Sequence, residues 1–446
     1  MVASQHTSLL TPHLRTLLVC YPAARCWVAY SGGLDSHVLL HAMASLRDEQ
    51  PGRVVEAIHV NHALQPQAHA WAEHCQQVCA ALQVPCHVLQ VNAAPARGES
   101  PEAAARHARY QALAGTLQAG DVLLTAHHRD DQAETLLLQL LRGSGPHGLA
   151  AMPLVSPFGP GLHLRPLLEF THAELQHYAS EQQLAWVDDP SNAETSFDRN
   201  YVRHEIMPRL LARWPATSAM LARSARHAAD AAKVLDTMAQ HDLTHVAGEA
   251  GTLSVMQLQT LDLPRQRNAL RAWFRQLNLP LPSAAHIEHI LRDLVAAASD
   301  KEPCVRWPGV EVRRYRDSMY ACRPLPLHDS ALILVWDMQA PLRLPADLGT
   351  LHVTPMQGQG LKAALRDRAD ISVRFRRGGE YCRPVGRGHR HELRKLCQEA
   401  GIPPWQRDRM PLIYVGAELA AVGSRWLCEP FQAEVDETGL LIAQQA

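Results

Sequence analysis

Residues 26–46 combine three patterns that restrict the fold more than any other stretch of the chain. The segment 26–30, CWVAY, consists of strand formers, and the small polar segment 31–36, SGGLDS, follows it directly. Apolar residues at helical spacing begin at Val38. A strand that passes through a tight turn into a helix exposes the N–H groups of the first helical turn, where an anion is stabilised. The segment predicts an α/β unit with a phosphate site at residues 31–36; a plain turn with a serine cap is the alternative.

Strands and helices continue to alternate after this unit. We expect strands at 54–60, 86–91 and 121–125, and helices at 68–82, 102–117 and 131–142. This order predicts a doubly wound parallel sheet, in which ligands bind at the carboxyl ends of the strands. The polar segments 59–62 (HVNH) and 126–128 (AHH) fall at such ends. Together with the turn at 31–36, they are expected to form one nucleotide site.

Two better-known phosphate-binding loops are excluded. The sequence contains no G-x-x-x-x-G-K-[ST] motif, so a Walker A loop is absent. The segment 143–148, GSGPHG, matches G-x-G-x-x-G formally, but it follows a predicted helix and contains Pro146. It therefore lacks the strand-to-helix context of a dinucleotide site.

Composition narrows the class of protein. A chain of 446 residues with 47% hydrophobic residues is long enough for two or three domains. Its ten cysteines include no C-x-x-C pair, and neither a leader-like start nor an apolar run long enough to span a membrane is present. We expect a cytoplasmic protein with reduced thiols and no membrane partner. The net charge of −1 does not by itself indicate a nucleic-acid partner.

The S-G-G-x-D-S motif after a strand resembles the pyrophosphate (PP) loop of N-type ATP pyrophosphatases. Those enzymes cut ATP between its α and β phosphates and adenylylate a substrate. Within that superfamily, later segments resemble the tRNA(Ile)-lysidine synthetases: HHRDDQAET at 127–135, DPSN at 189–192, RNYVRH at 199–204, and the C-terminal block at 374–423. Many adenylating enzymes share the first motif, whereas the set of segments in this order is specific.

The resemblance implies an ATP- and Mg²⁺-dependent ligase. In that family, cytidine 34 of tRNA(Ile) with a CAU anticodon is adenylated, and L-lysine then displaces AMP to give lysidine. The implied ATP-binding residues are those of the loop: Ser31, Gly32, Gly33, Leu34, Asp35 and Ser36. The implied catalytic residues are Asp35, Arg109, His127, Asp131, Arg199 and Arg203, with Mg²⁺ on Asp35 and Asp131 and with Asp130 as a helix cap.

Residues 127–134 also allow interpretations without catalysis. Asp131 and Glu134 have the spacing of a capping box. Two histidines beside two aspartates resemble a metal site, although no third ligand is evident. Arg199 and Arg203, one helical turn apart, either reach phosphates of ATP or tRNA or are solvated surface residues.

The downstream half is predicted to be helical over 216–298, followed by a hairpin at 305–315 and a linker at 323–328. The outward positions of the hairpin are expected to include Arg306, Arg313, Arg314 and Arg316. Between residues 374 and 409 the chain holds ten Lys/Arg against four acids, the pattern of a phosphate-backbone contact or of a solvated face. By resemblance, the tRNA-binding residues are Arg374, Arg376, Arg377, Arg383, Arg387, Arg390, Arg394 and Lys395.

These patterns predict three domains. They are an α/β PP-loop domain at 1–215, a mainly helical tRNA-binding domain at 216–325, and a basic α+β tRNA-binding domain at 330–446. A tRNA thiolase of the same superfamily is an alternative, but that chemistry usually needs a C-x-x-C pair. A non-catalytic tRNA-binding protein is another alternative, which the intact loop serines and Asp35 argue against. The sequence leaves open whether the chain forms a homodimer.

Overall fold

The computed structural model describes residues 9–23, 25–49, 53–61, 67–92, 94, 101–297, 303–327 and 329–445. The chain divides into two compact units, 1–237 and 238–446, and the boundary falls inside the long helix α11 (Thr217–Val246). Within the described residues no helix is both long and apolar enough to cross a membrane.

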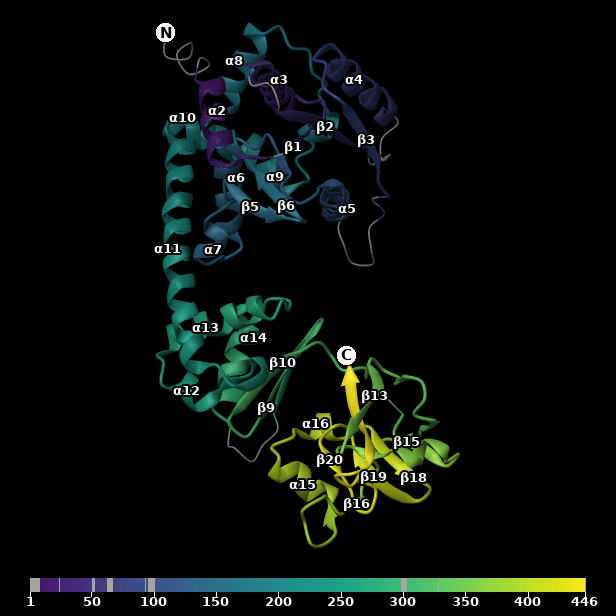
Figure 1. Cartoon of the computed structure of the whole chain (residues 1–446). Helices are drawn as coiled ribbons and strands as arrows, with labels where there is room; N and C mark the ends of the chain where they lie inside the picture. Colours follow the sequence, from purple (N-terminus) through teal and green to yellow (C-terminus); the bar gives the residue numbers. More distant parts are fainter. Residues whose placement is uncertain are drawn as a thin grey trace. The chain divides into compact units, whose positions relative to one another are not determined.

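The first unit is built on a six-stranded sheet in the order β3-β2-β1-β4-β6-β5 (Figure 1). All neighbours pair in parallel except β5, which is antiparallel to β6. The strands are β1 (Arg25–Ala29), β2 (Val54–Asn61), β3 (Cys86–Gln90), β4 (Val122–Leu124), β5 (Val155–Phe158) and β6 (Gly161–Leu164). This confirms the doubly wound α/β fold; the β5–β6 hairpin at the edge of the sheet was not predicted.

Helices cover both faces of this sheet, and the side chains of β1 point alternately to one face and the other. Cys26 and Val28 pack into the core that includes α3 (Leu34–Glu49), whereas Trp27 packs on the opposite face with Leu113. Trp27 also donates a hydrogen bond from Nε1 to Asp121 (2.9 Å). The remaining helices of the unit are α2 (Leu10–Cys20), α4 (Ala68–Ala81), α5 (Pro101–Thr116), α6 (Arg129–Leu141), α7 (Pro146–Leu149), α8 (His172–Glu181), α9 (Asp198–Tyr201) and α10 (Met207–Arg213).

The glycine-rich segment 143–148 follows α6 and leads into the short helix α7. A helix and not a strand leads into this segment, which confirms that it is not a dinucleotide-binding loop.

The second unit begins with the predicted helices and hairpin. Its first sheet has the order β7-β10-β9-β8 and packs on α13, whose Trp273 and Phe274 are buried. The elements are α12 (Val255–Gln259), α13 (Leu263–Gln276), α14 (Ala284–His289), a π-helical segment (Ile290–Val295), β7 (Leu253–Ser254), β8 (Cys304–Trp307), β9 (Val310–Tyr315) and β10 (Ser318–Cys322).

One predicted outward position of this hairpin is wrong. Arg314 lies on the same face of β9 as Val310 and Val312 and is only 7% exposed. Its guanidinium donates to the backbone carbonyls of Leu294, Val295 and Ala297 at the end of the π-helical segment. The last carbonyls of a helix lack partners in the helix itself, so the buried arginine serves as a helix cap.

Residues 332–442 contain two further apolar cores and three antiparallel sheets, the smallest of which pairs β16 (Tyr381–Cys382) with β17 (His391–Glu392), as expected for a small α+β domain. The two larger sheets have the orders β11-β15-β18-β19-β20 and β12-β13-β21-β14, in which β11 is Ile333–Val335, β20 is Trp426–Leu427, β12 is Leu342–Arg343 and β14 is Leu361–Lys362. Their longest strands are β13 (Thr350–Gln357), β21 (Thr438–Gln445), β19 (Glu418–Val422), β15 (Ile371–Arg374) and β18 (Leu412–Val415), and the helices are α15 (Leu393–Glu399) and α16 (Pro404–Arg407). The division of the whole chain into three domains stays a prediction.

Candidate active site

The turn at residues 31–36 joins β1 to α3 and is closed by its own hydroxyls. Ser36 Oγ donates to the carbonyl of Gly33 (2.9 Å) and lies 3.0 Å from Ser31 Oγ. Gly32 has a φ of +89°, and a Cβ there would lie 3.1 Å from the Cys75 sulfur. Only glycine adopts this backbone without strain. The chain therefore passes from strand to helix with the N–H groups of the first turn of α3 at the carboxyl edge of the sheet.

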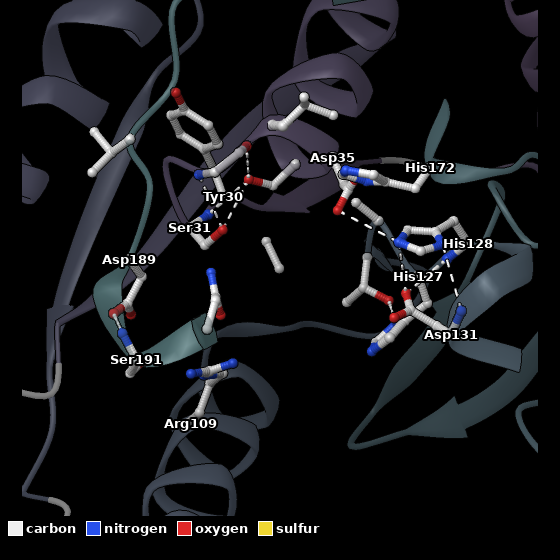
Figure 2. A pocket seen from close by; sticks show the side chains of 18 of the residues that line it. Tyr30, Ser31, Asp35, Arg109, His127, His128, Asp131, His172, Asp189 and Ser191 are labelled. Atoms are coloured by element: carbon white, nitrogen blue, oxygen red, sulfur yellow. Dashed lines mark hydrogen bonds and ion pairs between the residues drawn. The ribbon is translucent and has the colours of Figure 1, made fainter. Parts of the chain in front are cut away.

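A cavity of about 850 Å³ lies at this edge (Figure 2). The loop, the end of β2 and the end of β4 all line it, through residues that include Ser31, His59, Asn61 and His127. The predicted convergence of three loops is thus observed; His62, which belonged to the same prediction, lies outside the described residues. The volume is adequate for a nucleotide together with a second small substrate.

Arg109 lines the same cavity from α5, beside Asp189 and Ser191 of the DPSN segment (Figure 2). Asp189 accepts a hydrogen bond from the N–H of Ser191 (2.9 Å), so the segment forms a tight turn. Burial lowers the pKa of Arg109, but a guanidinium stays protonated throughout the physiological range. Arg109 therefore brings a positive charge into the cavity.

Asp35, in the first turn of α3, contacts two histidines. His172 Nδ1 lies 3.0 Å from Asp35 Oδ1, and His128 Nε2 lies 3.6 Å from Asp35 Oδ2. The hydrogen bond to Asp35 raises the pKa of His172. Sequence reasoning missed His172, because a histidine at the start of a predicted helix, 137 residues after Asp35, gives no signal of its own.

The three side chains place ligand atoms within 4.8 Å of one another, close enough to hold a metal ion. Mg²⁺ prefers oxygen ligands, so of this group only the Asp35 carboxylate suits it. His172 orients that carboxylate through its hydrogen bond, and the His128 ring lies beside it.

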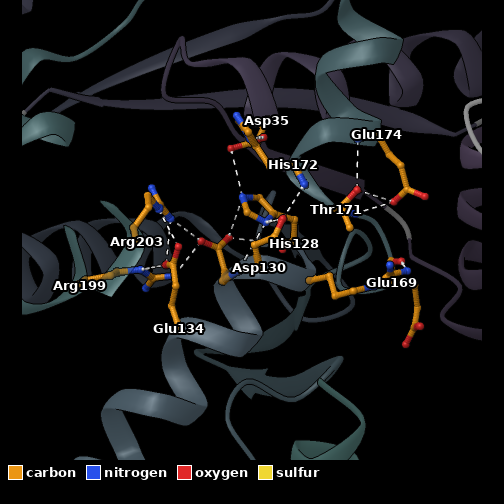
Figure 3. Close-up of polar contacts among 12 residues, drawn as sticks. Asp35, His128, Asp130, Glu134, Glu169, Thr171, His172, Glu174, Arg199 and Arg203 are labelled. Atoms are coloured by element: carbon orange, nitrogen blue, oxygen red, sulfur yellow. Dashed lines mark hydrogen bonds and ion pairs between the residues drawn. The ribbon is translucent and has the colours of Figure 1, made fainter. Parts of the chain in front are cut away.

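Asp131 and Glu134 of α6 form a buried ion-pair cluster with Arg199 and Arg203. Figure 3 shows Glu134 beside the two arginines. Both guanidiniums donate to Asp131 Oδ1 at 2.8 Å, and their Nε atoms donate to Glu134 at 3.0 and 2.7 Å. The carboxylate side chains are 10% and 2% exposed. The interpretation of the arginines as solvated surface residues is therefore wrong, whereas their contact with phosphates stays a prediction.

The charged groups in this cluster shift the pKa values of their neighbours. Burial alone raises the pKa of Asp131, but the neighbouring His128 and the two arginines hold it well below its usual range. Burial alone lowers the pKa of Arg203, but its hydrogen bond to Glu134 raises it. Asp131 is consequently ionised near neutral pH.

The cap of α6 differs from the prediction. His128 is the N-cap: its Nδ1 accepts from the N–H of Asp131 (3.4 Å), and Asp131 Oδ2 accepts from the N–H of His128 (3.0 Å). The capping box predicted for Asp131 and Glu134 is therefore wrong, because Asp131 is its third helical residue and not its first member. Asp130 does cap, but it accepts from the N–H of His172 (2.9 Å) and so caps α8, not its own helix.

His127 is the end of a buried hydrogen-bond series that runs to β6. Thr125 Oγ1 lies 2.8 Å from His127 Nδ1 and 2.8 Å from His163 Nε2, and Arg165 Nη2 lies 3.0 Å from His163 Nδ1. Burial lowers the pKa of His127 to about 4. Burial, and the charge of Arg165, lower the pKa of His163 to about 3. Sequence reasoning missed His163 and Thr125, since the β5–β6 hairpin was not predicted.

Three of the residues predicted to bind tRNA are engaged within the protein. Arg374 lies over the Tyr414 ring, with its guanidinium carbon 4.4 Å from the ring centroid. Arg376 pairs with Glu380, and Arg377 donates to two backbone carbonyls. These contacts organise the turn before α15.

The other five are exposed. Arg383 and Arg387 pair with glutamates at 3.1 and 2.8 Å. Arg390, Arg394 and Lys395 form no ion pair with any residue that the structure describes. The sequence-predicted basic patch is thus reduced to a small group around the start of α15 whose charge is uncompensated.

A parallel sheet whose first strand enters α3 through Ser31–Ser36, with a cavity at its carboxyl edge, defines a PP-loop nucleotide-binding enzyme. The PP-loop domain family matches residues 5–210. Two further families, the TilS substrate binding domain and the TilS substrate C-terminal domain, match residues 253–320 and 371–443.

Curated relatives along nearly the whole chain carry the name tRNA(Ile)-lysidine synthase. One, from Coxiella burnetii, is 45% identical over 412 residues, 92% of this chain and 91% of the relative. Another, from Methylococcus capsulatus, is 43% identical over 425 residues, 95% and 96% of the two chains. A third, from Alkalilimnicola ehrlichii, is 45% identical over 427 residues, 94% of each. The chain belongs to the tRNA(Ile)-lysidine synthase family, and the resemblance drawn from its sequence is confirmed.

The buried ion-pair cluster generates a stability prediction. Glu134→Gln leaves two part-buried guanidiniums with one carboxylate between them, so it should lower the free energy of unfolding by about 3 kcal/mol. Glu169→Gln is the control, because Glu169 pairs with Arg226 at 3.1 Å on the surface and should cost less than about 1 kcal/mol. Urea unfolding followed by circular dichroism measures both, and equal losses in the two variants would contradict the energetic role of the cluster.

The buried histidines generate a pH prediction. The folded pKa values of His127 and His163 lie below the ordinary histidine value, so the unfolded chain binds more protons as pH falls below about 6.5. Stability contributed by these neutral rings is complete above that pH and is lost on acidification. Urea unfolding at about pH 7 and about pH 5 should show a smaller pH effect in His163→Gln than in the wild type. The exposed control His69→Gln should keep the wild-type difference; a His163→Gln difference as large as that of the wild type would refute the assignment.

Proposed function

We propose that this chain joins L-lysine to C2 of cytidine 34 in tRNA(Ile) with the CAU anticodon, using ATP and Mg²⁺. The product is lysidine, which changes the codon read from AUG to AUA, and pyrophosphate and AMP are released. The observation that carries this proposal is the single cavity in which the PP loop, Asp35, Arg109 and His127 meet. Identity of 45% to named lysidine synthases over nearly the whole chain supports it.

In the first step, O2 of cytidine 34 forms a bond to the α phosphorus of ATP as the bond to the β-phosphate oxygen breaks. The loop N–H groups hold the leaving pyrophosphate, and the hydroxyls of Ser31 and Ser36 keep the loop closed in the shape that presents those N–H groups. Arg109 stabilises negative charge on the α phosphate. Mg²⁺, when bound, neutralises charge on the phosphates.

Asp35 is the residue that suits Mg²⁺, because its carboxylate belongs to the phosphate loop itself and lines the cavity. Asp131, the other residue expected to bind Mg²⁺, already accepts from Arg199, Arg203 and the His128 N–H. We therefore place Asp131 as a positioning residue that holds the 127–131 segment, and Arg199 and Arg203 with it.

In the second step, the unprotonated ε-amine of lysine forms a bond to C2 of the cytosine, and the bond from C2 to O2 breaks, so that O2 leaves on AMP. The proton that the amine loses passes to a carboxylate or a histidine of the cavity. Asp35, Asp130 and His127 line this cavity and are the candidates.

The exposed cations around α15 are the best-placed phosphate ligands of the C-terminal region. Phosphate contacts add affinity and salt dependence without specifying sequence. Exchange of Arg390, Arg394 and Lys395 for alanine together should weaken tRNA binding and reduce the slope of log K against log salt by about 2. Filter binding at several salt concentrations measures this slope. An Arg223→Ala control, on the exposed surface of α11, should leave it unchanged, and an unchanged slope in the triple variant would remove α15 from the interface.

The reaction itself is tested by incubating the protein with ATP, Mg²⁺, radiolabelled lysine and bulk bacterial tRNA, and counting acid-stable label in the RNA. Asp35→Asn should lower the initial rate at least about 100-fold, because the variant loses the charge at the phosphates while keeping the shape of the side chain. Asp48→Asn, an exposed aspartate of the same helix, is the control and should retain the wild-type rate.

Absence of label from wild-type reactions would contradict the proposal. Pyrophosphate release that needs a sulfur donor would instead favour the thiolase, and tRNA binding without either reaction would favour a binding protein.

A further inference from the structure

Between β4 and β6, four side chains are joined in series from the surface of the sheet to the cavity: Arg165, His163, Thr125 and His127. His163 and Thr125 are buried, at 1% and 7% exposure, and Arg165 is 9% exposed. We propose that the first three act as positioning residues that fix His127 in the tautomer with its proton on Nε2. His127 is then a neutral hydrogen-bond donor to the α phosphate and not the base that accepts the lysine proton.

Arg165 determines which atom donates and which accepts in each hydrogen bond of the series. A guanidinium only donates hydrogen bonds, so His163 Nδ1, 3.0 Å from Arg165 Nη2, must be the acceptor and carries no proton. The His163 proton is therefore on Nε2. Because both ring nitrogens have partners, at 2.8 and 3.0 Å, the ring has one orientation that satisfies both contacts.

Thr125 connects His163 to His127, because its hydroxyl accepts one hydrogen bond and donates the other. Its hydroxyl accepts from His163 Nε2–H and has one proton of its own, which it donates to His127 Nδ1 at 2.8 Å. His127 Nδ1 is thus an acceptor, and a neutral His127 must carry its proton on Nε2. The burial that keeps both rings neutral agrees with this assignment.

If the proposed function holds, this tautomer decides which group of the cavity donates a hydrogen bond to the phosphate and which accepts the lysine proton. A neutral Nε2–H can donate to an oxygen on which negative charge develops, such as a nonbridging oxygen of the α phosphate. It cannot accept the proton of the lysine amine, because its only lone pair faces the Thr125 hydroxyl. That proton must pass to a carboxylate of the cavity, and Asp35 and Asp130 are the candidates because Asp131 is already bound by Arg199 and Arg203.

The tautomer can be observed directly in the wild-type chain. In full-length protein labelled with ¹⁵N-histidine, the two ring nitrogens of His127, assigned with a His127→Gln sample, should show a protonated Nε2 and an unprotonated Nδ1 near neutral pH. A protonated Nδ1, or a doubly protonated ring, would overturn the proposal. This measurement needs no activity, so it separates a failure of the series from a failure of the proposed function.

Variants test the role of the series in the reaction. Thr125→Val keeps the shape but removes the hydroxyl, so His127 should become a mixture of tautomers and the rate of tRNA adenylation should fall about 100-fold, with little change in the KM for ATP. Thr125→Ser should restore both the single tautomer and the rate. Thr116→Val, which removes a hydroxyl bonded only within α5, is the matched control. Retention of the wild-type tautomer and rate in Thr125→Val would overturn the proposal.

Discussion

The buried cluster of Asp131 and Glu134 with Arg199 and Arg203 is the interaction on which the geometry of this site depends. Two carboxylates from one helix and two guanidiniums from a segment 65 or more residues later are removed from water together. Either partner set alone would leave uncompensated buried charge, so α6 and the segment around α9 are held in one arrangement. Asp131 also closes the cap on His128, which transmits that arrangement to the histidines at the cavity.

The pairing of cations within the protein also explains how a chain with a net charge of −1 can act on phosphate-rich substrates. Several arginines near the site and in the C-terminal region are bound to carboxylates or to backbone carbonyls, as Arg199, Arg376 and Arg377 illustrate. The group at α15 is one place where exposed positive charge forms no ion pair with a described residue. Local charge, and not the overall balance, therefore decides where a polyanion is expected to bind.

The sequence predicted those parts of the fold and site that depend on local patterns. The strand, turn and helix around Gly32 were predictable because the residue types in each of these segments favour that local structure. The alternation of strands and helices after Gly32 predicted the parallel sheet. Contacts between distant segments were not predictable in this way. The pairing of Asp35 with His172 and the series from Arg165 to His127 depend on which strands lie side by side. The cap at His128 was missed because histidine is an unusual N-cap residue, and Asp131 and Glu134 had a more familiar spacing.

The proposed reaction differs from most adenylations in that the cavity activates the RNA base and not the amino acid. This order of events is tested with ATP labelled with ³²P at the α phosphate, Mg²⁺ and tRNA(Ile), without lysine, followed by separation of the RNA. If the base is activated, the label enters the RNA, and added lysine then releases it as AMP. Label that never enters the RNA, and is found on lysine instead when lysine is supplied, would show that the amino acid is activated.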